Sequence, residues 1–434
     1  MRAVVAELTV PRYLTTAARS RLQDDAGWRR GGLLRAEHHV APPALPGPGW
    51  VRLRTELAGI CGSDVGLAHA RISLTLSTFY PARRIIPGHE LVGVVEATGP
   101  GVGRLREGDR VALDPVLSCV HRGFDPVCGS CARARPYTCE RFDLAGTSGC
   151  TGVGQGFDAR LGGGFGELVV AHEDQCVPVH DLPSRRAVLL EPAAVALHAA
   201  LRWEGGGERA VVIGPGTIGL LTTAALRRLH PELHLTVVSP DEFGDGRATR
   251  VGADRVLRGG ASAVHTLAAE DGGRVLSPDR TALPILERGV EVVYDCVGTP
   301  ATIDLALHLL RPGGTLVLVG AAGRQRVDWS LVWNRELTVR GTINAGPEAS
   351  LDGRRTRHEV AEWLADPHYP VDGLITHLVP LERFGDGLAV ASAGSRARAG
   401  KVVLRPGDDP PLVGTLDACV PVPAAGAQGR GTAS

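Results

Sequence analysis

The feature that most constrains the fold is a glycine-rich turn after a short apolar run. Residues 210–213 are apolar, and Gly214, Gly216 and Gly219 follow them with the spacing GxGxxG. Residues 218–228 then have the composition of a helix. In this context the glycines permit a tight turn and let a pyrophosphate approach the helix N-terminus, where unpaired N–H groups favour anions. The sequence therefore predicts an α/β unit with a dinucleotide site.

Strand and helix patterns continue to alternate after this turn. Further apolar segments occupy residues 235–238, 290–294 and 315–319, and residues 301–310 have a helical pattern between the last two. Alternation of this kind specifies a doubly wound parallel sheet with helices on both faces. We predict that this cofactor domain covers residues 206–341.

The rest of the chain has a different character. Residues 1–205 are rich in Gly, Pro and short β-branched runs, which favour a β-rich domain with irregular loops. Residues 342–405 regain a mixed pattern, and we expect them to rejoin and complete the first domain. Residues 406–434 lack periodicity and predict a disordered tail. Residues 12–30 are predicted to form an insertion after the first strand.

Length and composition indicate two large domains, since a domain averages about 150 residues and this chain has 434. Its 47 basic and 47 acidic residues cancel, so no net charge draws it toward nucleic acid. The uncharged stretch 210–226 is shorter than the ~20 residues of a membrane span and is broken by glycines. An early charge at the N-terminus argues against a signal peptide, so we expect a cytoplasmic protein without a membrane segment.

Cysteine, histidine and carboxylates gather in two short motifs. Cys61-Gly62-Ser63-Asp64 and Gly88-His89-Glu90 contain the side chains that bind zinc, and three protein ligands with an open fourth position make a zinc site that does chemistry. A second group follows at Cys128, Cys131 and Cys139. Because several of the nine cysteines are grouped as metal ligands would be, we expect no disulfide framework.

These motifs together resemble the zinc-containing medium-chain dehydrogenase/reductase family, which includes alcohol, sorbitol, threonine and glucose dehydrogenases. The resemblance covers roughly residues 1–405. It also includes Glu107-Gly108-Asp109-Arg110-Val111, Gly163-Gly164-Phe165, Glu191-Pro192-Ala193 and Leu310-Arg311-Pro312-Gly313-Gly314. The resemblance implies a β-rich GroES-like catalytic domain and a Rossmann domain that binds NAD or NADP.

The resemblance also implies a catalytic zinc held by Cys61, His89 and Glu191. Zinc there acts as a Lewis acid on an alcohol or carbonyl oxygen. Glu191 in place of a second cysteine resembles the sorbitol-type site. Glu90 is either an alternative ligand or a carboxylate that supports the ligands.

Two further residues have roles implied by the family. Ser63 matches the hydroxyl that passes the substrate proton onward, and Asp64 matches the carboxylate that orients the zinc-bound histidine. Their alternative interpretations are a turn serine and a capping aspartate. Many relatives carry a histidine at the position of Gly66, so the end of the proton relay is open, and His69 lies nearby in the sequence.

The cysteine group resembles the family's structural zinc lobe, with one departure. The usual first cysteine would fall at Asp125, and the next candidate upstream is Cys119. Structural zinc favours four protein ligands with thiolates preferred, so we predict Cys119 together with Cys128, Cys131 and Cys139. Asp125 is the alternative fourth ligand.

The dinucleotide is predicted to lie on Gly214, Gly216, Thr217, Ile218 and Gly219. About 20 residues on, an acidic residue would bind the ribose hydroxyls of NAD. Ser239 stands there instead, followed by Pro240 and Asp241. Either Asp241 reaches the ribose, or Arg247 and Arg250 serve the 2′-phosphate of NADP, so both cofactors stay open.

The leading hypothesis is a zinc-dependent oxidoreductase that transfers a hydride between NAD(P) and a secondary alcohol, a polyol or a sugar-like hydroxyl, or the corresponding carbonyl. The alternatives are a zinc-free enzyme of the quinone-reductase kind and a non-catalytic nucleotide-binding protein of the same fold. The expected partner is a small-molecule substrate. Since relatives are commonly dimers or tetramers joined through the cofactor domain, we expect a homo-oligomer.

Overall fold

The computed structural model describes residues 1–203, 205–278 and 283–414. Contacts divide the chain into two compact units, one made of residues 1–191 with the described residues from 372 onward, the other of residues 192–371. The domain limits predicted at 205/206 and 341/342 stay predictions. Of the predicted disordered tail, residues 415–434 lie outside the described residues, whereas the Val413 carbonyl accepts from the Ser184 N–H and the Val413 N–H donates to the Ser184 hydroxyl.

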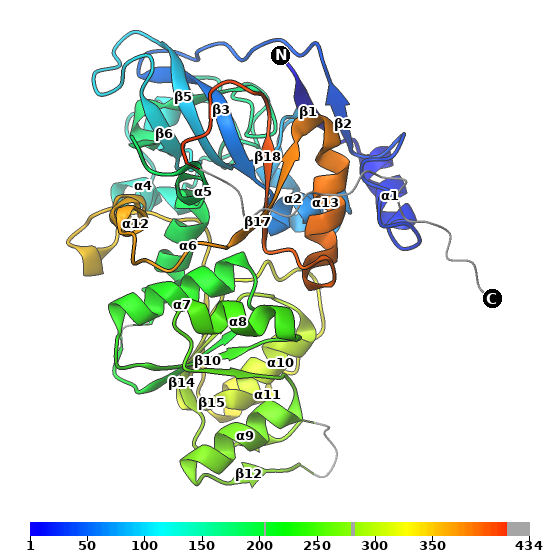
Figure 1. Cartoon of the computed structure of the whole chain (residues 1–434), viewed down its shortest axis with the longest axis vertical. Coiled ribbons are helices and arrows are strands. Elements are labelled where there is room, and N and C mark those ends of the chain that lie inside the picture. The colour runs from blue at the N-terminus through cyan, green and yellow to red at the C-terminus, as the bar shows by residue number, and fades with distance from the viewer. Residues whose placement is uncertain (204, 279–282, 415–434) are drawn as a thin grey trace. The chain divides into compact units, whose positions relative to one another are not determined.

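The second unit contains the predicted parallel sheet (Figure 1). Its strand order is β11-β10-β9-β14-β15-β16, in which every neighbouring pair is parallel. This is the Rossmann order, and the sequence of strands reverses between β9 and β14. The strands are β9 (Arg209–Ile213), β10 (His234–Val238), β11 (Arg255–Leu257), β14 (Val290–Asp295), β15 (Leu310–Leu318) and β16 (Thr338–Gly341).

Helices connect these strands and bury their apolar faces against them, as the alternating pattern predicted. Ala210, Val211 and Val212 of β9 are each no more than 1% exposed, which explains why this strand has a continuous apolar run. The helices are α6 (Leu190–Ala200), which crosses the boundary between the units, α7 (Thr217–Leu229), α8 (Glu242–Arg250), α9 (Ala261–Asp271), α10 (Pro300–Leu309), α11 (Ser330–Asn334) and α12 (Thr356–Ala365). Short β12 (Val275–Leu276) and β13 (Ile285–Leu286) pair antiparallel.

The first unit is the predicted β-rich domain. Its larger sheet has the order β17-β18-β3-β5-β6-β8, with β7 paired to β3. The strands are β3 (Trp50–Gly59), β5 (Glu90–Thr98), β6 (Arg110–Leu113), β7 (Leu168–His172), β8 (Cys176–Pro178), β17 (Ile375–Pro380) and β18 (Lys401–Arg405). Because β18 pairs with β3, the C-terminal part of the chain returns to the sheet of the first unit.

A smaller sheet and several short helices complete this unit. Strands β2 (Leu34–Glu37), β1 (Ala3–Glu7) and β4 (Arg84–Ile85) form the smaller sheet in that order. The helices are α1 (Val10–Arg19), α2 (Gly62–Ala68), α3 (Cys119–Arg122), α4 (Gly129–Ala132), α5 (Ser184–Ala187) and α13 (Phe384–Ala393).

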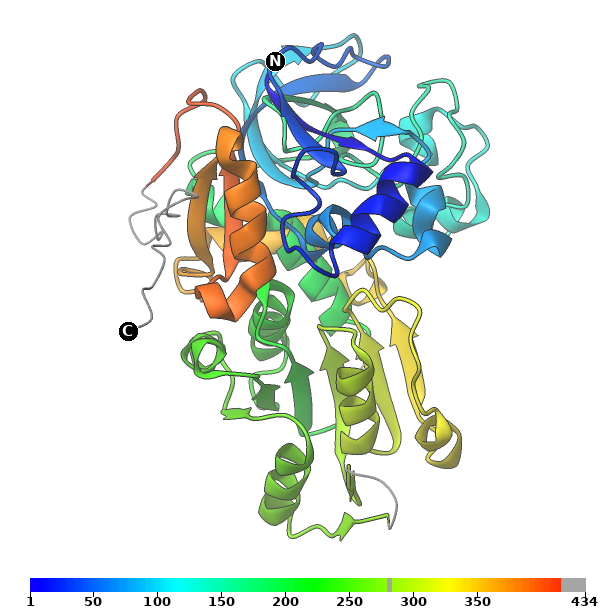
Figure 2. The same ribbon diagram turned by 90° about the vertical axis from the view of Figure 1, so that its right-hand side faces the viewer.

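The predicted insertion is ordered and lies against α2. Figure 2 shows helix α1 in dark blue with the lighter blue α2 beside it. The Tyr13 hydroxyl donates to the Ile72 carbonyl, and the Trp28 ring lies edge-on to His69 at 5.6 Å between centroids. A Cβ atom on Gly27 would lie only 1.8 Å from the Ala68 carbonyl oxygen, so glycine is needed for this close approach.

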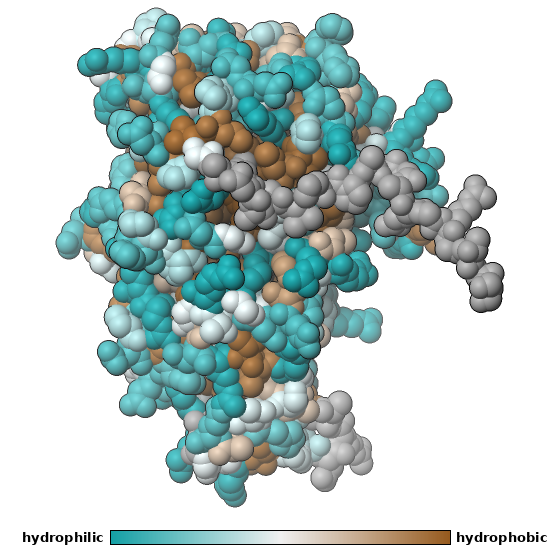
Figure 3. All heavy atoms as spheres, in the orientation of Figure 1, coloured by the Kyte–Doolittle hydropathy of each residue, from teal (hydrophilic) through white to brown (hydrophobic). Residues whose placement is uncertain are grey.

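Hydrophilic side chains cover most of the face drawn in Figure 3, with separate hydrophobic patches between them. Within residues 1–203, 205–278 and 283–414, no helix is both long enough and apolar enough to span a membrane.

Candidate active site and metal centres

The motifs that contain Cys61 and His89 meet in the first unit. One ligand atom from each of Cys61, His89 and Glu90 lies within 4.8 Å of the others. Cys61 is the residue before α2, and His89 directly precedes β5. Gly88 has φ +91°, and a Cβ there would lie 2.9 Å from the Phe165 backbone nitrogen. Glycine at this position therefore lets the turn bring His89 close to Cys61.

Charge couples this group to Glu191. Burial alone would lower the pKa of His89, but Cys61, Asp64 and Glu191 outweigh it and raise the pKa well above its usual value. Burial raises the pKa of Glu191, and His89 opposes that shift. Glu191, in the first turn of α6, lies outside the compact group of three ligand atoms in the described chain. The soft thiolate, the imidazole and the carboxylate nevertheless fit zinc by chemistry.

Glu90 has a partner that the sequence motifs did not predict. Its carboxylate forms an ion pair with Lys401, and the two side chains are 1% and 3% exposed. The Lys401 Nζ also donates to the Ile60 carbonyl at 3.0 Å. Gly59 makes room for the pair, because a Cβ there would lie 2.0 Å from a Glu90 oxygen. Lys401 thus joins Glu90 to the residue before Cys61.

Helix α2 carries the residues of the predicted proton relay. The Asp64 carboxylate accepts a hydrogen bond from the Cys61 N–H at 2.9 Å, as a helix-capping aspartate does. Ser63 is half-buried in the same first turn, and a Cβ on Gly66 would meet only Ile72, at 3.6 Å. His69 is 2% exposed, and its Nε2 lies 2.7 Å from the Ser392 hydroxyl. The relay roles of Ser63 and Asp64 remain predictions.

Two aromatic residues beside this group were missed by the sequence analysis. The Phe157 ring lies 5.5 Å from that of His89, and the Tyr80 ring lies 5.0 Å from that of Phe157. Neither residue stands in a motif or a periodic segment, so no local signal predicts them.

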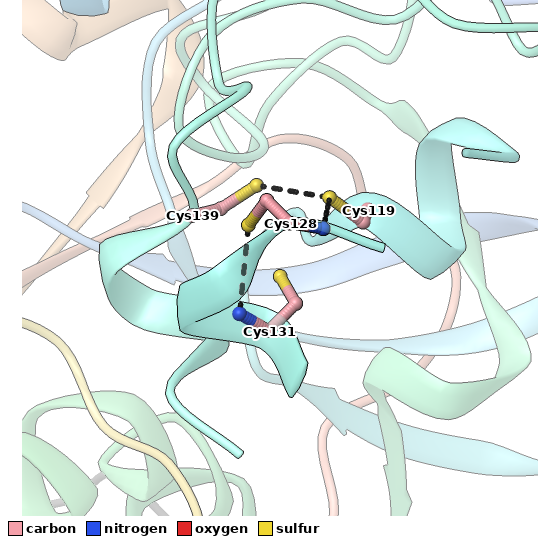
Figure 4. A group of neighbouring side chains, drawn as sticks. All are labelled: Cys119, Cys128, Cys131 and Cys139. Carbon is pink, nitrogen blue, oxygen red and sulfur yellow. Dashed lines mark hydrogen bonds between the residues drawn. The ribbon is translucent and has the colours of Figure 1, made fainter. Parts of the chain in front are cut away.

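The four cysteines of the predicted lobe lie together (Figure 4). Their sulfur atoms all lie within 4.8 Å of one another, and those of Cys119 and Cys139 are 3.6 Å apart. Asp125, the alternative fourth ligand, is exposed and is not a member of this group among the described residues. Four thiols around one point have the donor set of a closed structural zinc site.

Backbone groups and a buried arginine surround these thiols. Burial opposes the shift, but the N–H groups of Cys131 and Glu140 lower the pKa of Cys128 to about 6. Burial raises the pKa of Cys139 to about 11. The fully buried Arg122 donates to the Leu117 carbonyl at 2.9 Å and to the Cys139 sulfur at 3.9 Å. The lobe therefore holds a cation beside sulfur atoms that become anionic when they bind a metal.

A third group, His121, His172 and Asp174, also places its ligand atoms within 4.8 Å of one another. The Nδ1 atom of His121 accepts from the Ser118 N–H, and that of His172 accepts from the Asp174 N–H. Each neutral ring then carries its proton on Nε2, so neither nitrogen offers a free lone pair. This group does not fit a metal ion.

The glycine fingerprint has the geometry of a dinucleotide cradle. Gly214 has φ +95°, and a Cβ on Gly219 would lie 1.9 Å from the Gly214 carbonyl oxygen. A Cβ on Gly216 would meet nothing within 4 Å, so the space in front of it is open. Gly216 precedes α7, which begins with Thr217 and Ile218, and no side chain caps this helix start. Its N–H groups are therefore available to a pyrophosphate.

The ribose end of this region differs from the usual acidic pattern. Ser239, which follows β10, is fully buried, and its hydroxyl donates to the Asp241 carbonyl at 2.7 Å. The Asp241 carboxylate caps α8 by accepting from the Phe243 and Gly244 N–H groups at 3.1 and 3.3 Å. The sequence analysis kept Asp241 as a candidate to bind the ribose hydroxyls. In this structure its carboxylate oxygen Oδ1 accepts hydrogen bonds from the start of α8 instead.

Comparison with protein families agrees with both units. Residues 47–181 match the alcohol dehydrogenase GroES-like domain, and residues 217–365 match the zinc-binding dehydrogenase model. A curated L-idonate 5-dehydrogenase from Vitis vinifera is 30% identical over 78% of this chain and 83% of its own length. The chain belongs to the zinc-containing medium-chain dehydrogenase/reductase family. The family predicted from the motifs is thereby confirmed.

Other members of this family are similar over most of their length. A sorbitol dehydrogenase from Arabidopsis thaliana is 30% identical over 82% of this chain and 90% of that protein. Among solved structures, galactitol-1-phosphate dehydrogenase from Escherichia coli has a TM-score of 0.68 at 23% identity and covers 94% of this chain and 100% of that one. This structural likeness confirms the predicted fold.

This medium-chain dehydrogenase is therefore an NAD(P)-dependent oxidoreductase of the zinc type. Its residues fit the dinucleotide and the zinc. The open space before Gly216 suits a dinucleotide, and the two thiol-containing sites suit zinc.

Proposed function

We propose that this enzyme oxidises a secondary hydroxyl of a polyol or sugar-like substrate with NAD(P)⁺, or reduces the corresponding ketone. The observation that carries this proposal is the similarity to two dehydrogenases named for polyhydroxy compounds, L-idonate and sorbitol, each at 30% identity. The carboxylate ligand Glu191, in place of a second cysteine, supports the same substrate class.

Cys61, His89 and Glu191 would hold the proposed catalytic zinc. Zinc supplies Lewis acidity that lowers the pKa of an alcohol, and the nicotinamide accepts a hydride. Ser63, two residues after Cys61, would pass the substrate proton onward. Asp64 accepts a hydrogen bond from the Cys61 N–H and so holds the backbone of this proposed ligand in place. Glu90, held by its ion pair with Lys401, is proposed to support the ligands Cys61 and His89.

The proposed cofactor site consists of the fingerprint residues Gly214, Gly216, Thr217, Ile218 and Gly219. Ser239 and Asp241 would lie at the adenosine ribose. Ser239 is neutral, and one carboxylate oxygen of Asp241 caps α8, so neither side chain is set to repel a 2′-phosphate. The proposed site therefore accepts NAD⁺ or NADP⁺, and both are tested in the assay.

The structural zinc is proposed at Cys119, Cys128, Cys131 and Cys139. The proximity of all four sulfur atoms supports Cys119 over Asp125. Since thiolates must stay reduced to bind zinc, we also propose that the enzyme acts in the cytoplasm, as the sequence predicted.

A substrate panel tests the proposed function. The purified zinc-loaded enzyme is assayed at 340 nm with NAD⁺ or NADP⁺ and with sorbitol, xylitol, L-idonate, L-threonine and 2-butanol. We expect the highest kcat/KM for a polyhydroxy substrate. A preference for L-threonine or 2-butanol would contradict the polyol proposal, and quinone reduction by the zinc-free protein would favour the zinc-free alternative.

An oligomer is proposed through the edge of the cofactor sheet. Strand β16 ends the sheet order, and its residues are all exposed. Exposed apolar side chains lie near it in sequence: Trp329, Trp333, Val339 and Ile343 are 48%, 82%, 37% and 49% exposed. An exposed strand edge with apolar neighbours is suited to pairing with a second copy of the chain.

A further inference from the structure

A segment before His89 places one tyrosine close to the candidate zinc site. The 3₁₀ helix η1 (Leu74–Phe79) contains no buried residue, and its Leu74 is 65% exposed. Tyr80 directly follows it, yet it is half-buried and packs against the core of the first unit. The segment is held at its other end by the Tyr13 hydroxyl, which donates to the Ile72 carbonyl. The chain therefore turns Tyr80 inward while its neighbours stay outside.

Aromatic contacts connect Tyr80 to a predicted zinc ligand. The Tyr80 and Phe157 rings lie 5.0 Å apart with a tilt of 45°, and the Phe157 and His89 rings lie 5.5 Å apart with a tilt of 41°. All three residues belong to the first unit. Phe157 thus contacts both the phenol ring and the imidazole, and no direct ring contact joins Tyr80 to His89 among the described residues.

The Tyr80 hydroxyl is chemically available. Among residues 1–203, 205–278 and 283–414, no hydrogen-bond partner accompanies this hydroxyl, whereas that of Tyr13 is used. Burial raises the pKa of Tyr80, and the charges of Asp64 and Cys61 raise it further. The phenol thus stays neutral and can both donate and accept a hydrogen bond.

We propose that Tyr80 determines substrate specificity by hydrogen-bonding a second hydroxyl of the substrate, next to the one that reacts. This inference rests on the proposed function. A site that hydrogen-bonds a substrate hydroxyl discriminates against analogues that lack it, because its polar group is then left unpaired. Phe157, in contact with both the Tyr80 and the His89 ring, supplies an apolar surface beside this hydroxyl.

The test compares Tyr80→Phe with the wild-type enzyme on two substrates, the best polyol of the panel and the monohydric 2-butanol. Phenylalanine keeps the ring and its contact with Phe157 and removes only the hydroxyl. We expect kcat/KM for the polyol to fall about ten-fold or more, with kcat/KM for 2-butanol changed less than about two-fold. The ratio of the two values is the readout, since a general loss of folding or zinc lowers both equally.

Tyr13→Phe is the matched control. It removes one phenolic hydroxyl from the contact that anchors the same segment, but that hydroxyl already serves the Ile72 carbonyl. We expect it to change both substrates alike. An unchanged ratio in Tyr80→Phe, or an equal change of ratio in both variants, would overturn the role of Tyr80 while leaving the proposed function intact. Wild-type enzyme that oxidises no polyol would overturn the proposed function first and this inference with it.

Discussion

At the scale of single residues, the active-site region depends on a buried ion pair. Lys401 is the one lysine among 47 basic residues, and its side chain is almost fully enclosed with that of Glu90. A buried charge is costly unless it is paired and hydrogen-bonded, which explains why Lys401 also reaches the Ile60 carbonyl. The pair therefore joins the residue before Cys61 to the residue after His89, next to two proposed zinc ligands.

Replacing Lys401 by methionine is expected to destabilise the protein by about 3–5 kcal/mol, because the Glu90 carboxylate would stay buried without a counter-charge. Urea unfolding of the first unit, followed by tryptophan fluorescence, measures the change.

The double variant Lys401→Met/Glu90→Gln removes both charges and serves as the control. We expect it to regain most of the lost stability, since no buried charge remains. Equal stability of Lys401→Met and the wild-type enzyme would contradict a structural role for the pair.

Local motifs predicted Cys61, His89 and the fingerprint glycines, because each belongs to a short motif in which the spacing of residue types corresponds to a particular backbone turn. Lys401, Tyr80 and Phe157 could not be predicted in this way. Lys401 and Phe157 reach the site through tertiary packing from distant parts of the chain, and Tyr80 turns inward from an otherwise exposed segment before His89. The lone lysine in an arginine-rich chain was the one available signal, and it carried no information about a partner.

At the scale of elements, the insertion after the first strand, residues 12–30, packs against α2 and supports it. Gly27 touches the C-terminal end of α2, while Cys61 stands at the other end. The role of this segment could not be predicted, because its contacts depend on the close approach of two backbones rather than on a periodic apolar face.

Gly27→Ala is expected to lower the free energy of unfolding by about 1–3 kcal/mol, since the new Cβ would clash with the Ala68 carbonyl. Thermal unfolding measures it. Gly47→Ala is the matched control, because a Cβ there meets nothing within 4 Å and should leave the stability nearly unchanged. Equal effects of both variants would argue against the contact with α2.

The cysteine lobe is an element whose affinity for zinc should depend on pH. Burial raises the pKa of Cys131 and Cys139, so these groups are thiols in the metal-free lobe at neutral pH and must lose protons to bind zinc. Zinc affinity should therefore rise with pH and fall as the pH is lowered.

We expect an increase of about ten-fold per pH unit for each proton displaced between pH 6 and 8. Competition with a chromophoric chelator measures this slope, with Cys128→Ser as a variant that weakens the site. A slope of zero for the lobe zinc would show that its thiols are already ionised.

At the scale of the whole molecule, the alternation of strands and helices was sufficient to predict the parallel sheet, because each element buries an apolar face of its own period. The return of β17 and β18 to the first sheet was expected only from a change of pattern after the cofactor domain. Exact limits are harder to predict, since α6 begins in one compact unit and continues in the other.

The exposed edge of β16 predicts self-association. Val339→Lys places a charge in the centre of this strand, where a second copy would otherwise pair, and should convert the oligomer to a monomer in light scattering. Arg311→Lys, which leaves this edge untouched, is the control. A wild-type chain that is already a monomer would contradict the proposed interface.

The central claim is that zinc at Cys61, His89 and Glu191 is required for oxidation of the substrate. Zinc content by elemental analysis, measured together with NAD(P)⁺ reduction for the wild type, Cys61→Ala and Cys150→Ala, tests it most directly. Cys150 is a buried cysteine outside both proposed sites, so its variant removes the same atom elsewhere. We predict that Cys61→Ala loses one equivalent of zinc and at least about 10³-fold in kcat/KM, while Cys150→Ala keeps both. Full zinc content and full activity in Cys61→Ala would contradict the account.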